Sequence, residues 1–418
     1  MDSFIIEGPT KLNGEVDISG SKNSALPIMA ACLAKPGIYS LKNIPDLKDT
    51  KTMLKLLEII GSDVTKNNDV IIIDTTKCDN PEAPYNLVKT MRASFYVLGP
   101  LISRFKYAKV SLPGGCAWGP RPIDFHLSAF EKLGAEVKLK SGYIITKGKL
   151  HGGMVKFPKP SVGATGNVLM SCINLNEEVI IENAAMEPEI VDLCNFLTQI
   201  GISISGIGTD VLTIKGNDLN NIINFEYEII PDRIEAGTFL IACAATGGCV
   251  RLNNINSTHL SAIIGMLSEA GMNIKHTKNS IVIKSSGEVK SINLKTDIYP
   301  GFPTDLQAQW IALMCKANGQ TIVEDTIYLD RFTHVPELNR LGANISVNNN
   351  VATIFGNKKL FGTNLMSTDI RASASLIIAA MCSEGRSKLS RVYHIDRGYE
   401  KIENKLNVLG ANIDRIKS

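Results

Sequence analysis

The sequence predicts an α/β protein of two similar lobes, each built from three βαβαββ repeats. Segments such as "AFEKLGAEV" and "KLNVLGANI" recur along the chain with one plan, an amphipathic helix, a glycine and a β-type strand. A second series of apolar helices alternates with them, and β-branched stretches such as "DVIIID" and "VATIFG" lie between. The copies divide evenly into two sets of three, which predicts two lobes.

The amphipathic series ends each time at a glycine. These glycines are spaced 67 to 73 residues apart and are Gly61, Gly134, Gly201, Gly271, Gly342 and Gly410. Glycine readily adopts the left-handed conformation that ends a helix and turns the chain into the next strand. A repeat of this length is large enough to form a small subdomain, so we expect closed lobes rather than a solenoid.

The second series predicts six buried helices. Each stretch opens with small or charged residues and is then apolar on almost every face. The stretches are 20–37, 90–105, 162–175, 232–248, 302–319 and 369–385. Basic residues stand at four of these helix starts, namely Lys22, Arg92, Arg233 and Arg371. If the starts converge on a cleft between the lobes, they form a site for an anion.

Composition excludes several classes of protein. The 418 residues are 44% hydrophobic and 20% charged with a net charge of +3, which is typical of a soluble globular protein and gives no electrostatic case for nucleic acid. The longest uncharged apolar segment, 236–250, is too short to span a bilayer, and the N-terminus lacks the features of a secretory signal. Nine scattered cysteines without a CxxC pattern, and six histidines without HxxxH spacing, indicate a reducing cytoplasm and no metal site.

The stretch "LPGGCAWGPRP", residues 112–122, suits neither a helix nor a strand interior because of its clustered glycines and prolines. We therefore expect a loop that acts as a lid. Cys116 lies in this loop, whereas most other cysteines lie inside apolar runs. With Arg121 nearby to favour the thiolate, Cys116 is suited to act as a nucleophile or proton donor. The alternative is an incidental thiol on a surface turn.

Other charged residues also have two interpretations. Asp305, in "YPGFPTDLQAQ", is either an N-cap aspartate or a general base for a hydroxyl. Asp369 and Arg371, in "STDIRASAS", are alternatively a helix cap and a member of a satisfied ion pair. Lys22 is either a solvated lysine in a first helical turn or a contact for an anion.

The motifs "SGSKNSALPIMAACL", "LPGGCAWGPRPIDFH", "YPGFPTDLQAQ", "TDIRASASL" and "YHIDRGYEKIENKL" resemble those of the UDP-N-acetylglucosamine 1-carboxyvinyltransferases. These enolpyruvyl transferases begin peptidoglycan synthesis, and the resemblance extends in collinear order over essentially the whole chain. It implies that each lobe is an inside-out α/β barrel of three βαβαββ repeats, with the active site in the inter-lobe cleft. It places the first lobe, with the cysteine loop 112–122, at residues 21–229, and forms the second from 1–20 and 230–418.

The resemblance implies transfer of the enolpyruvyl group of phosphoenolpyruvate to the 3′-hydroxyl of UDP-N-acetylglucosamine, with release of phosphate by addition and elimination. It implies no metal ion and no organic cofactor. We expect these two small molecules as partners, with no nucleic acid and no membrane insertion, and we expect a cytoplasmic monomer.

Roles for individual residues follow from the same resemblance. Cys116 matches the loop cysteine that forms an adduct with phosphoenolpyruvate, helps to protonate its methylene carbon and is alkylated by the epoxide fosfomycin. Asp305 matches the acid beside the sugar hydroxyl and is the expected general base. The cations that match the phosphoenolpyruvate site are Lys22, Arg121 and Arg397, with Arg92 nearby.

Contacts to the uridine nucleotide sugar are implied as well. Asn23 matches a sugar-side contact, and Asp369 matches a supporting carboxylate near the lysine. The complete expected substrate-binding set is Asn23, Arg92, Arg121, Pro122, Ile123, Asp124, Phe125, Lys159, Ser161, Val162, Ile327, Asp369 and Arg371.

Some features depart from the family's usual pattern, and alternatives stay open. The departures are Met186, Trp118 and the pair Leu329-Asp330 in "YLDRF", none of which removes a proposed catalytic group. One alternative is enolpyruvyl transfer to another acceptor, either shikimate 3-phosphate, whose enzymes lack the loop cysteine, or another uridine nucleotide. The other is a non-catalytic paralogue that senses UDP-sugars. A binding module needs no thiol on a lid, which argues against the second alternative.

Overall fold

The computed structural model describes residues 2–112, 123–217, 222–356 and 359–417. The chain divides into two compact units, which we call the inserted unit (Gly20–Ile230) and the flanking unit (Met1–Ser19 with Pro231–Ser418). Each unit has its own cluster of buried apolar side chains. Each is therefore described by itself.

The described part of the inserted unit contains three four-stranded sheets with one topology. In each sheet the first strand is parallel to the second, and the remaining neighbours are antiparallel. The first sheet is β14 (Ile223–Glu228), β3 (Gly37–Lys42), β5 (Val70–Asp74) and β4 (Asp63–Asn67). The second is β6 (Glu82–Ala83), β7 (Tyr107–Ser111), β9 (Tyr143–Lys147) and β8 (Glu136–Lys140). The third is β10 (Gly153–Lys156), β11 (Glu178–Glu182), β13 (Val211–Lys215) and β12 (Ser203–Ser205).

The described part of the flanking unit repeats this topology three times. Its first sheet is β2 (Leu12–Asp17), β15 (Gly248–Asn253), β17 (Ser280–Ser285) and β16 (Asn273–His276). The second is β18 (Leu294–Lys295), β19 (Gln320–Glu324), β21 (Val351–Phe355) and β20 (Asn344–Asn348). The third is β22 (Asn364–Met366), β23 (Gly385–Ser390), β1 (Ser3–Gly8) and β24 (Asn412–Ile416).

The predicted buried helices form, and they lie at the centre of each unit. Those of the inserted unit are α1 (Lys22–Ala31) with the 3-10 turn η1 (Cys32–Ala34), the 3-10 turn η2 (Arg92–Val97) with α4 (Leu98–Phe105), and α6 (Val162–Ser171). Those of the flanking unit are α8 (Arg233–Thr246), α10 (Gln307–Met314) and α12 (Ile370–Met381), which contact one another. No helix in the described part of the chain is long and apolar enough to cross a membrane.

The second helix of each repeat is amphipathic and ends at the predicted glycine. These helices are α2 (Lys48–Ile60), α5 (Asp124–Lys132), α7 (Pro188–Gln199), α9 (Ser261–Glu269), α11 (Val335–Arg340) and α13 (Ile402–Val408). All six glycines have φ between +92° and +105°. After α2, Gly61 N–H donates to the carbonyl of Glu58 and Ser62 N–H to that of Leu57, and the other five helix ends repeat this pair of bonds. The glycine-ended helices predicted from the sequence are thus confirmed as one recurring C-terminal motif.

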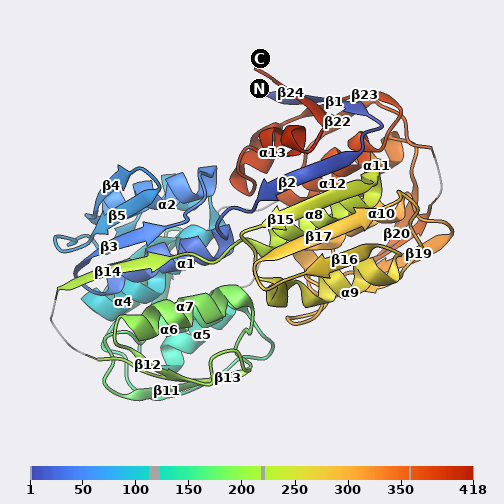
Figure 1. Ribbon diagram of the computed structural model, residues 1–418. Coiled ribbons are helices and arrows are strands. Elements are labelled where there is room, and N and C mark those ends of the chain that lie inside the picture. Colours follow the sequence, from blue (N-terminus) through green and yellow to red (C-terminus); the bar gives the residue numbers. More distant parts are fainter. Residues whose placement is uncertain (1, 113–122, 218–221, 357–358, 418) are drawn as a thin grey trace. The chain divides into compact units, whose positions relative to one another are not determined.

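Strands distant in the sequence close both units. β14, the last strand of the inserted unit, pairs in parallel with β3, its first. In the flanking unit, β1 lies between β23 and β24, and β2 pairs with β15. The two ends of the chain consequently lie close together beside β1 and β24 (Figure 1).

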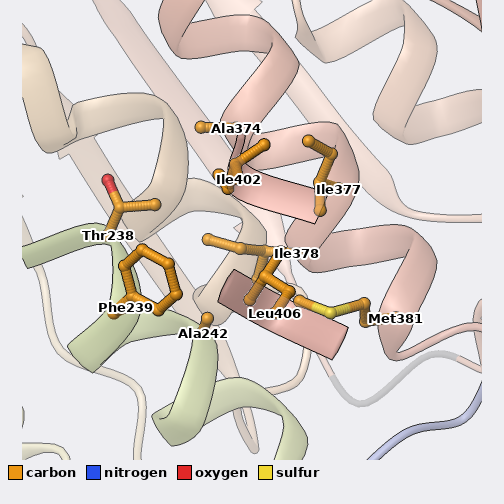
Figure 2. Close-up of a pocket in the computed structure, with 9 residues that line it drawn as sticks. All are labelled: Thr238, Phe239, Ala242, Ala374, Ile377, Ile378, Met381, Ile402 and Leu406. Atoms are coloured by element: carbon orange, nitrogen blue, oxygen red, sulfur yellow. The ribbon is translucent and has the colours of Figure 1, made fainter. Parts of the chain in front are cut away.

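A small cavity lies in the flanking unit between α8, α12 and α13 (Figure 2). Its volume is about 10 Å³, and it is lined by Thr238, Phe239, Ala242, Ala374, Ile377, Ile378, Met381, Ile402 and Leu406. A space of this size holds at most one water molecule, and its apolar walls offer a water almost no partners. It is a packing gap, far below the volume of a ligand site.

The helix-ending glycines predict the effect of adding a methyl group. Gly271 has φ +103°, and a Cβ there would meet nothing closer than the Lys290 side chain at 3.9 Å. Gly271→Ala should therefore lower the free energy of unfolding through backbone strain alone, by about 1–2 kcal/mol. Gly265, inside α9 with open space around it, is the matched control.

Gly265→Ala should raise the free energy of unfolding by up to about 1 kcal/mol, because alanine is the better helix former. Urea denaturation of both variants and the parent measures these changes. Equal stability of the two variants would show that the left-handed conformation at Gly271 carries no cost for alanine.

Candidate active site

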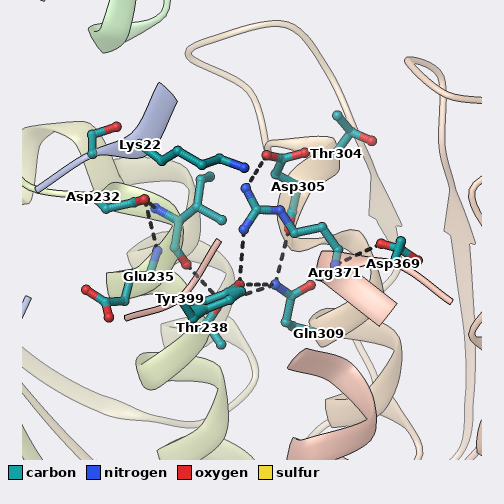
Figure 3. A network of polar contacts seen from close by, with 12 residues as sticks. Lys22, Asp232, Glu235, Thr238, Thr304, Asp305, Gln309, Asp369, Arg371 and Tyr399 are labelled. Atoms are coloured by element: carbon teal, nitrogen blue, oxygen red, sulfur yellow. Dashed lines mark hydrogen bonds and ion pairs between the residues drawn. The ribbon is translucent and has the colours of Figure 1, made fainter. Parts of the chain in front are cut away.

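Asp305 lies between two buried arginines in the flanking unit. It belongs to the 3-10 turn η4 (Thr304–Leu306), which leads directly into α10. Its Oδ2 accepts a hydrogen bond from Arg371 Nη2 at 2.6 Å (Figure 3), and its Oδ1 lies 2.8 Å from Arg331 Nη1. Arg371 and Arg331 are only 5% and 6% exposed. Two guanidinium groups that are largely shielded from water thus hold one carboxylate.

The three central helices of the flanking unit orient Arg371 (Figure 3). Its Nη1 donates to the Tyr399 hydroxyl at 3.2 Å, and its guanidinium lies over the Tyr399 ring at 5.6 Å. That hydroxyl is hydrogen-bonded to Thr238 Oγ1 of α8 at 2.8 Å and accepts from Gln309 Nε2 of α10 at 3.1 Å. The guanidinium therefore has a fixed position toward Asp305.

The ion pairs determine the charge state of Asp305. Burial raises the pKa of the carboxyl, but the charges and hydrogen bonds of Arg371 and Arg331 outweigh burial and hold its pKa well below the usual range. Conversely, burial lowers the pKa of Arg371, yet Asp305 raises it above its ordinary value. At neutral pH the group is an ionised, weakly basic carboxylate.

The capping alternative is confirmed for Asp369 and wrong for Asp305. Asp369 Oδ1 accepts from the backbone N–H groups of Arg371 at 2.8 Å and Ala372 at 3.1 Å, so it caps α12. Asp305 caps no helix, because it lies inside η4, after Pro303, with its carboxylate turned to the arginines. The ion pair expected for Arg371 exists, and its partner is Asp305.

The structure places two further expected residues in the flanking unit. Arg397 ends the 3-10 turn η5 (Val392–Arg397), which packs on α12. The next residue, Gly398, approaches Ile370 so closely that a Cβ would lie 2.5 Å from its Cγ2. Ile327 follows β19, and its backbone N–H donates to Asp325 Oδ1 at 3.0 Å. Tight packing and a buried carboxylate thus fix the backbone at both positions.

In the inserted unit, Lys22 is paired rather than solvated. It is the first residue of α1, and its Nζ lies 3.3 Å from Asp49 Oδ2 of α2. Both side chains are less than a tenth exposed. Asn23 follows in the first turn of α1 and is half-buried. The first-turn position is as predicted, but the lysine holds a carboxylate, which the sequence did not reveal.

The expected nucleotide contacts of the inserted unit lie at two neighbouring helix starts. Ile123, Asp124 and Phe125 begin α5, and Ser161 caps α6 by accepting from Ala164 N–H at 3.3 Å. The two helices contact each other, and a Cβ on Gly163 would lie 3.2 Å from His126 Cε1. Val162 is the first residue of α6, and Lys159, just before the cap, is exposed. The structure therefore brings these two segments together.

A buried histidine, His126, lies in the first turn of α5, and Arg92 is close enough to influence its charge. His126 Nδ1 is 3.0 Å from Asn167 Nδ2, and the imidazole packs edge-on against Phe95 at 5.0 Å. Burial, with the positive charge of Arg92, lowers the pKa of His126 to about 3. The imidazole is therefore neutral at physiological pH, with Nδ1 available to accept from Asn167.

Cys116, Arg121 and Pro122 lie outside the described residues, so their roles stay predictions. Burial raises the pKa to about 12 for several thiols elsewhere, namely Cys172, Cys194, Cys243, Cys315 and Cys382. These cysteines behave as small apolar side chains. The described ranges contain no group of three or more His, Cys, Asp or Glu side chains that could hold a metal ion.

Several residues of this polar network were missed at the level of sequence. Arg331 lies in "YLDRF", a segment that drew attention only for Leu329 and Asp330. Tyr399 lies two residues after Arg397, and Asp49 stands at the start of an ordinary amphipathic helix. Each of these residues acts through a partner from another segment of the chain, and the sequence does not show that partner.

Comparison with known proteins assigns the family. A family model described as EPSP synthase (3-phosphoshikimate 1-carboxyvinyltransferase) matches residues 6–406. A UDP-N-acetylglucosamine 1-carboxyvinyltransferase of Chlorobium phaeovibrioides is 49% identical over 100% of this chain and 99% of the relative. The corresponding protein of Geotalea daltonii is 48% identical over 100% of both chains. The chain belongs to this enolpyruvyl transferase family.

Solved structures of this enolpyruvyl transferase family share the fold. The enolpyruvyl transferase NikO from Streptomyces tendae has a TM-score of 0.90 at 23% identity, with 100% of this chain and 99% of that chain covered. EPSP synthase from Acinetobacter baumannii has a TM-score of 0.77 at 17% identity, with both chains fully covered. At these identities the likeness supports the fold alone, and the expected two-lobed α/β fold is confirmed.

The neutral, buried His126 predicts a pH dependence of stability. Its pKa is about 3 in the folded protein and about 6.5 when unfolded, so the folded state excludes a proton that the unfolded state binds. The associated stability is fully present above pH 6.5 and is lost as pH falls toward 3, by up to about 1.4 kcal/mol per pH unit. His126→Asn keeps an acceptor for Asn167 but cannot titrate.

The unfolding temperature should therefore fall less between pH 7 and pH 5 in His126→Asn than in the parent. Between pH 7.5 and 8.5 the two proteins should respond alike, which is the internal control. An equal fall on acidification would show that His126 does not exclude a proton.

Proposed function

We propose that this enzyme transfers the enolpyruvyl group of phosphoenolpyruvate to the 3′-hydroxyl of UDP-N-acetylglucosamine, the first committed step of peptidoglycan synthesis. In the addition, a proton joins the methylene carbon and the sugar oxygen bonds to C2. In the elimination, the methyl group formed from the methylene carbon loses a proton and the C2–O bond to phosphate breaks, which restores the double bond. The observation that carries the proposal is the ionised Asp305 carboxylate beside buried Arg371, in a chain about half identical to transferases of this name.

We assign the hydroxyl proton to Asp305. A carboxylate held by two arginines stays ionised at neutral pH and is therefore always ready to accept a proton. Its weak basicity means that it takes the proton only as the new C–O bond makes the hydroxyl acidic. The cations for the phosphate and carboxylate of phosphoenolpyruvate are Lys22, Arg121 and Arg397, with Arg92 as a further candidate.

The helix starts of the inserted unit suit a nucleotide sugar. The start of α6 presents backbone N–H groups that favour a diphosphate, and exposed Lys159 adds a positive charge. Ile123, Asp124 and Phe125 border the same region, where the Phe125 ring stacks with Phe157 at 6.3 Å. Asn23, in the first turn of α1 of the same unit, is the proposed polar contact to the sugar, and Ile327 of the flanking unit is the proposed apolar one.

We also propose a cytoplasmic location and a monomer without nucleic-acid partners. The described cysteines are all free thiols, and most are buried, as expected in a reducing compartment. The net charge of +3 offers no attraction to nucleic acid.

Phosphate release from phosphoenolpyruvate tests the reaction and its acceptor. We expect release in the presence of UDP-N-acetylglucosamine and none with shikimate 3-phosphate, because the proposed acceptor site is built for a nucleotide. Release with shikimate 3-phosphate but not with UDP-N-acetylglucosamine would show that the enzyme uses the acceptor of the other branch of the family. No release with either acceptor would favour the non-catalytic, UDP-sugar-sensing alternative.

The predicted role of Cys116 is tested by substitution. Cys116→Ser should lower kcat by about 100-fold or more, because a serine hydroxyl is a far weaker acid than a thiol. Cys116→Asp should retain more activity, since a carboxyl also donates a proton. Cys249→Ser, at a half-exposed cysteine, is the matched control and should keep parent activity.

Fosfomycin provides a chemical test of the same residue. The epoxide should add its mass to the peptide that contains Cys116 and to no other cysteine. A modified peptide elsewhere in the chain would contradict the assignment of the reactive thiol.

A further inference from the structure

Asp325 is a completely buried carboxylate just after β19, and every partner that the structure gives it is neutral. Its Oδ1 accepts from Thr296 Oγ1 at 2.9 Å and from the backbone N–H groups of Ile327 and Tyr328, each at 3.0 Å. Its Oδ2 accepts from Thr304 Oγ1 at 2.7 Å. We propose that Asp325 is a positioning residue, which fixes Arg331 against Asp305 through the Thr304 hydroxyl. The inference rests on the proposed function, because it assigns a role within that site.

Asp325 holds the beginning of the loop that carries Arg331. Two of the bonds to Asp325 Oδ1 come from the backbone N–H groups of Ile327 and Tyr328 and hold the chain at the beginning of this loop. Thr326 strengthens the same attachment, since its Oγ1 donates to the Thr296 carbonyl at 2.6 Å. Asp325 therefore sets the starting point of the loop that brings Arg331 back to Asp305.

The Thr304 hydroxyl lies between Asp325 and Arg331 and has a fixed direction. A hydroxyl has one hydrogen, and Thr304 Oγ1 donates it to Asp325 Oδ2, so this hydrogen points to Asp325. The lone pairs of Thr304 Oγ1 are then available to Arg331 Nη1, which lies 3.0 Å away. The same Nη1 is 2.8 Å from Asp305 Oδ1. The Thr304 hydroxyl thus donates to Asp325 and accepts from Arg331, and it thereby helps to fix the arginine that holds the expected base.

Charge balance supports the same arrangement. A carboxylate that is removed from water requires compensation, and hydrogen bonds from neutral donors supply only part of it. Arg331 is one hydroxyl away from Asp325 and is itself 6% exposed. The Arg331 side chain is thus connected to both acids, directly to Asp305 and through the Thr304 hydroxyl to Asp325.

The test measures kcat and KM for phosphate release in Asp325→Asn, Thr304→Val, Thr304→Ser and the double variant Asp325→Asn/Thr304→Val. Asparagine keeps the loop bonds at Oδ1 but presents an N–H group to Thr304, which turns the hydroxyl away from its present direction. Valine removes the hydroxyl, and serine restores it. Thr321→Val is the matched control, because the Thr321 hydroxyl is buried on β19 and has no hydrogen-bond partner among the described residues.

We expect Asp325→Asn and Thr304→Val each to lower kcat by about 10-fold or more, with a smaller change in KM, and the double variant to lose little beyond either single variant. Thr304→Ser should recover most of the loss, and Thr321→Val should match the parent. If Asp325→Asn does not fold, the contrast between Thr304→Val and Thr304→Ser decides the question alone.

Different results would contradict the positioning role of Asp325 and the proposed function. Parent-like activity of Asp325→Asn or Thr304→Val, or fully multiplied losses in the double variant, would overturn the positioning role while the parent enzyme still releases phosphate. Failure of the parent to release phosphate would instead overturn the proposed function, and this inference with it.

Discussion

The ion pairs of Asp305 with Arg371 and Arg331 are the interaction on which the candidate site of the flanking unit depends. Charged groups shielded from water are costly unless each has a partner, and loss of Asp305 would remove the carboxylate that both arginines share. Asp305 precedes α10, Arg371 begins α12, and Arg331 lies in the loop after β19. Electrostatics therefore links three segments that lie far apart in the sequence.

The repeat explains why functional side chains gather at particular points. The buried helices begin at Lys22 in α1, at Val162 in α6 and one residue before Arg371 in α12. Each start presents backbone N–H groups and the positive end of a helix dipole, which favours anions such as phosphates and carboxylates. A fold that repeats one buried helix thus supplies several equivalent places for an anionic substrate, and side chains such as Ser161 and Asp369 distinguish them by capping.

Local features were predictable from the sequence. The glycine that ends α9, Gly271, acts through its own backbone and the residues within one turn, and its pattern therefore identifies the repeat. The β-branched stretches that form β5 and β21 were recognised for the same reason. Which strands close each unit was not predictable from periodicity, because β1 and β14 pair with strands far away in the chain.

The candidate site shows the same division. Motif resemblance identified Asp305, and the start of a buried helix identified Arg371. Their pairing joins residues far apart in the sequence, and it replaces the capping role that "PTDLQAQ" suggests for Asp305. Asp325 and Arg331 carried no sequence signal, since their significance lies in shared contacts to Thr304. Roles that depend on a distant partner become visible only in the structure.

Steady-state kinetics of an Asp305→Asn variant tests the central claim most directly. Asparagine has nearly the same size and can still accept a hydrogen bond from Arg371, but it cannot take a proton. We expect kcat to fall by about 100-fold or more, while the KM for UDP-N-acetylglucosamine changes far less. A folded variant with a kcat close to that of the parent would contradict the assignment of Asp305 as the group that receives the hydroxyl proton.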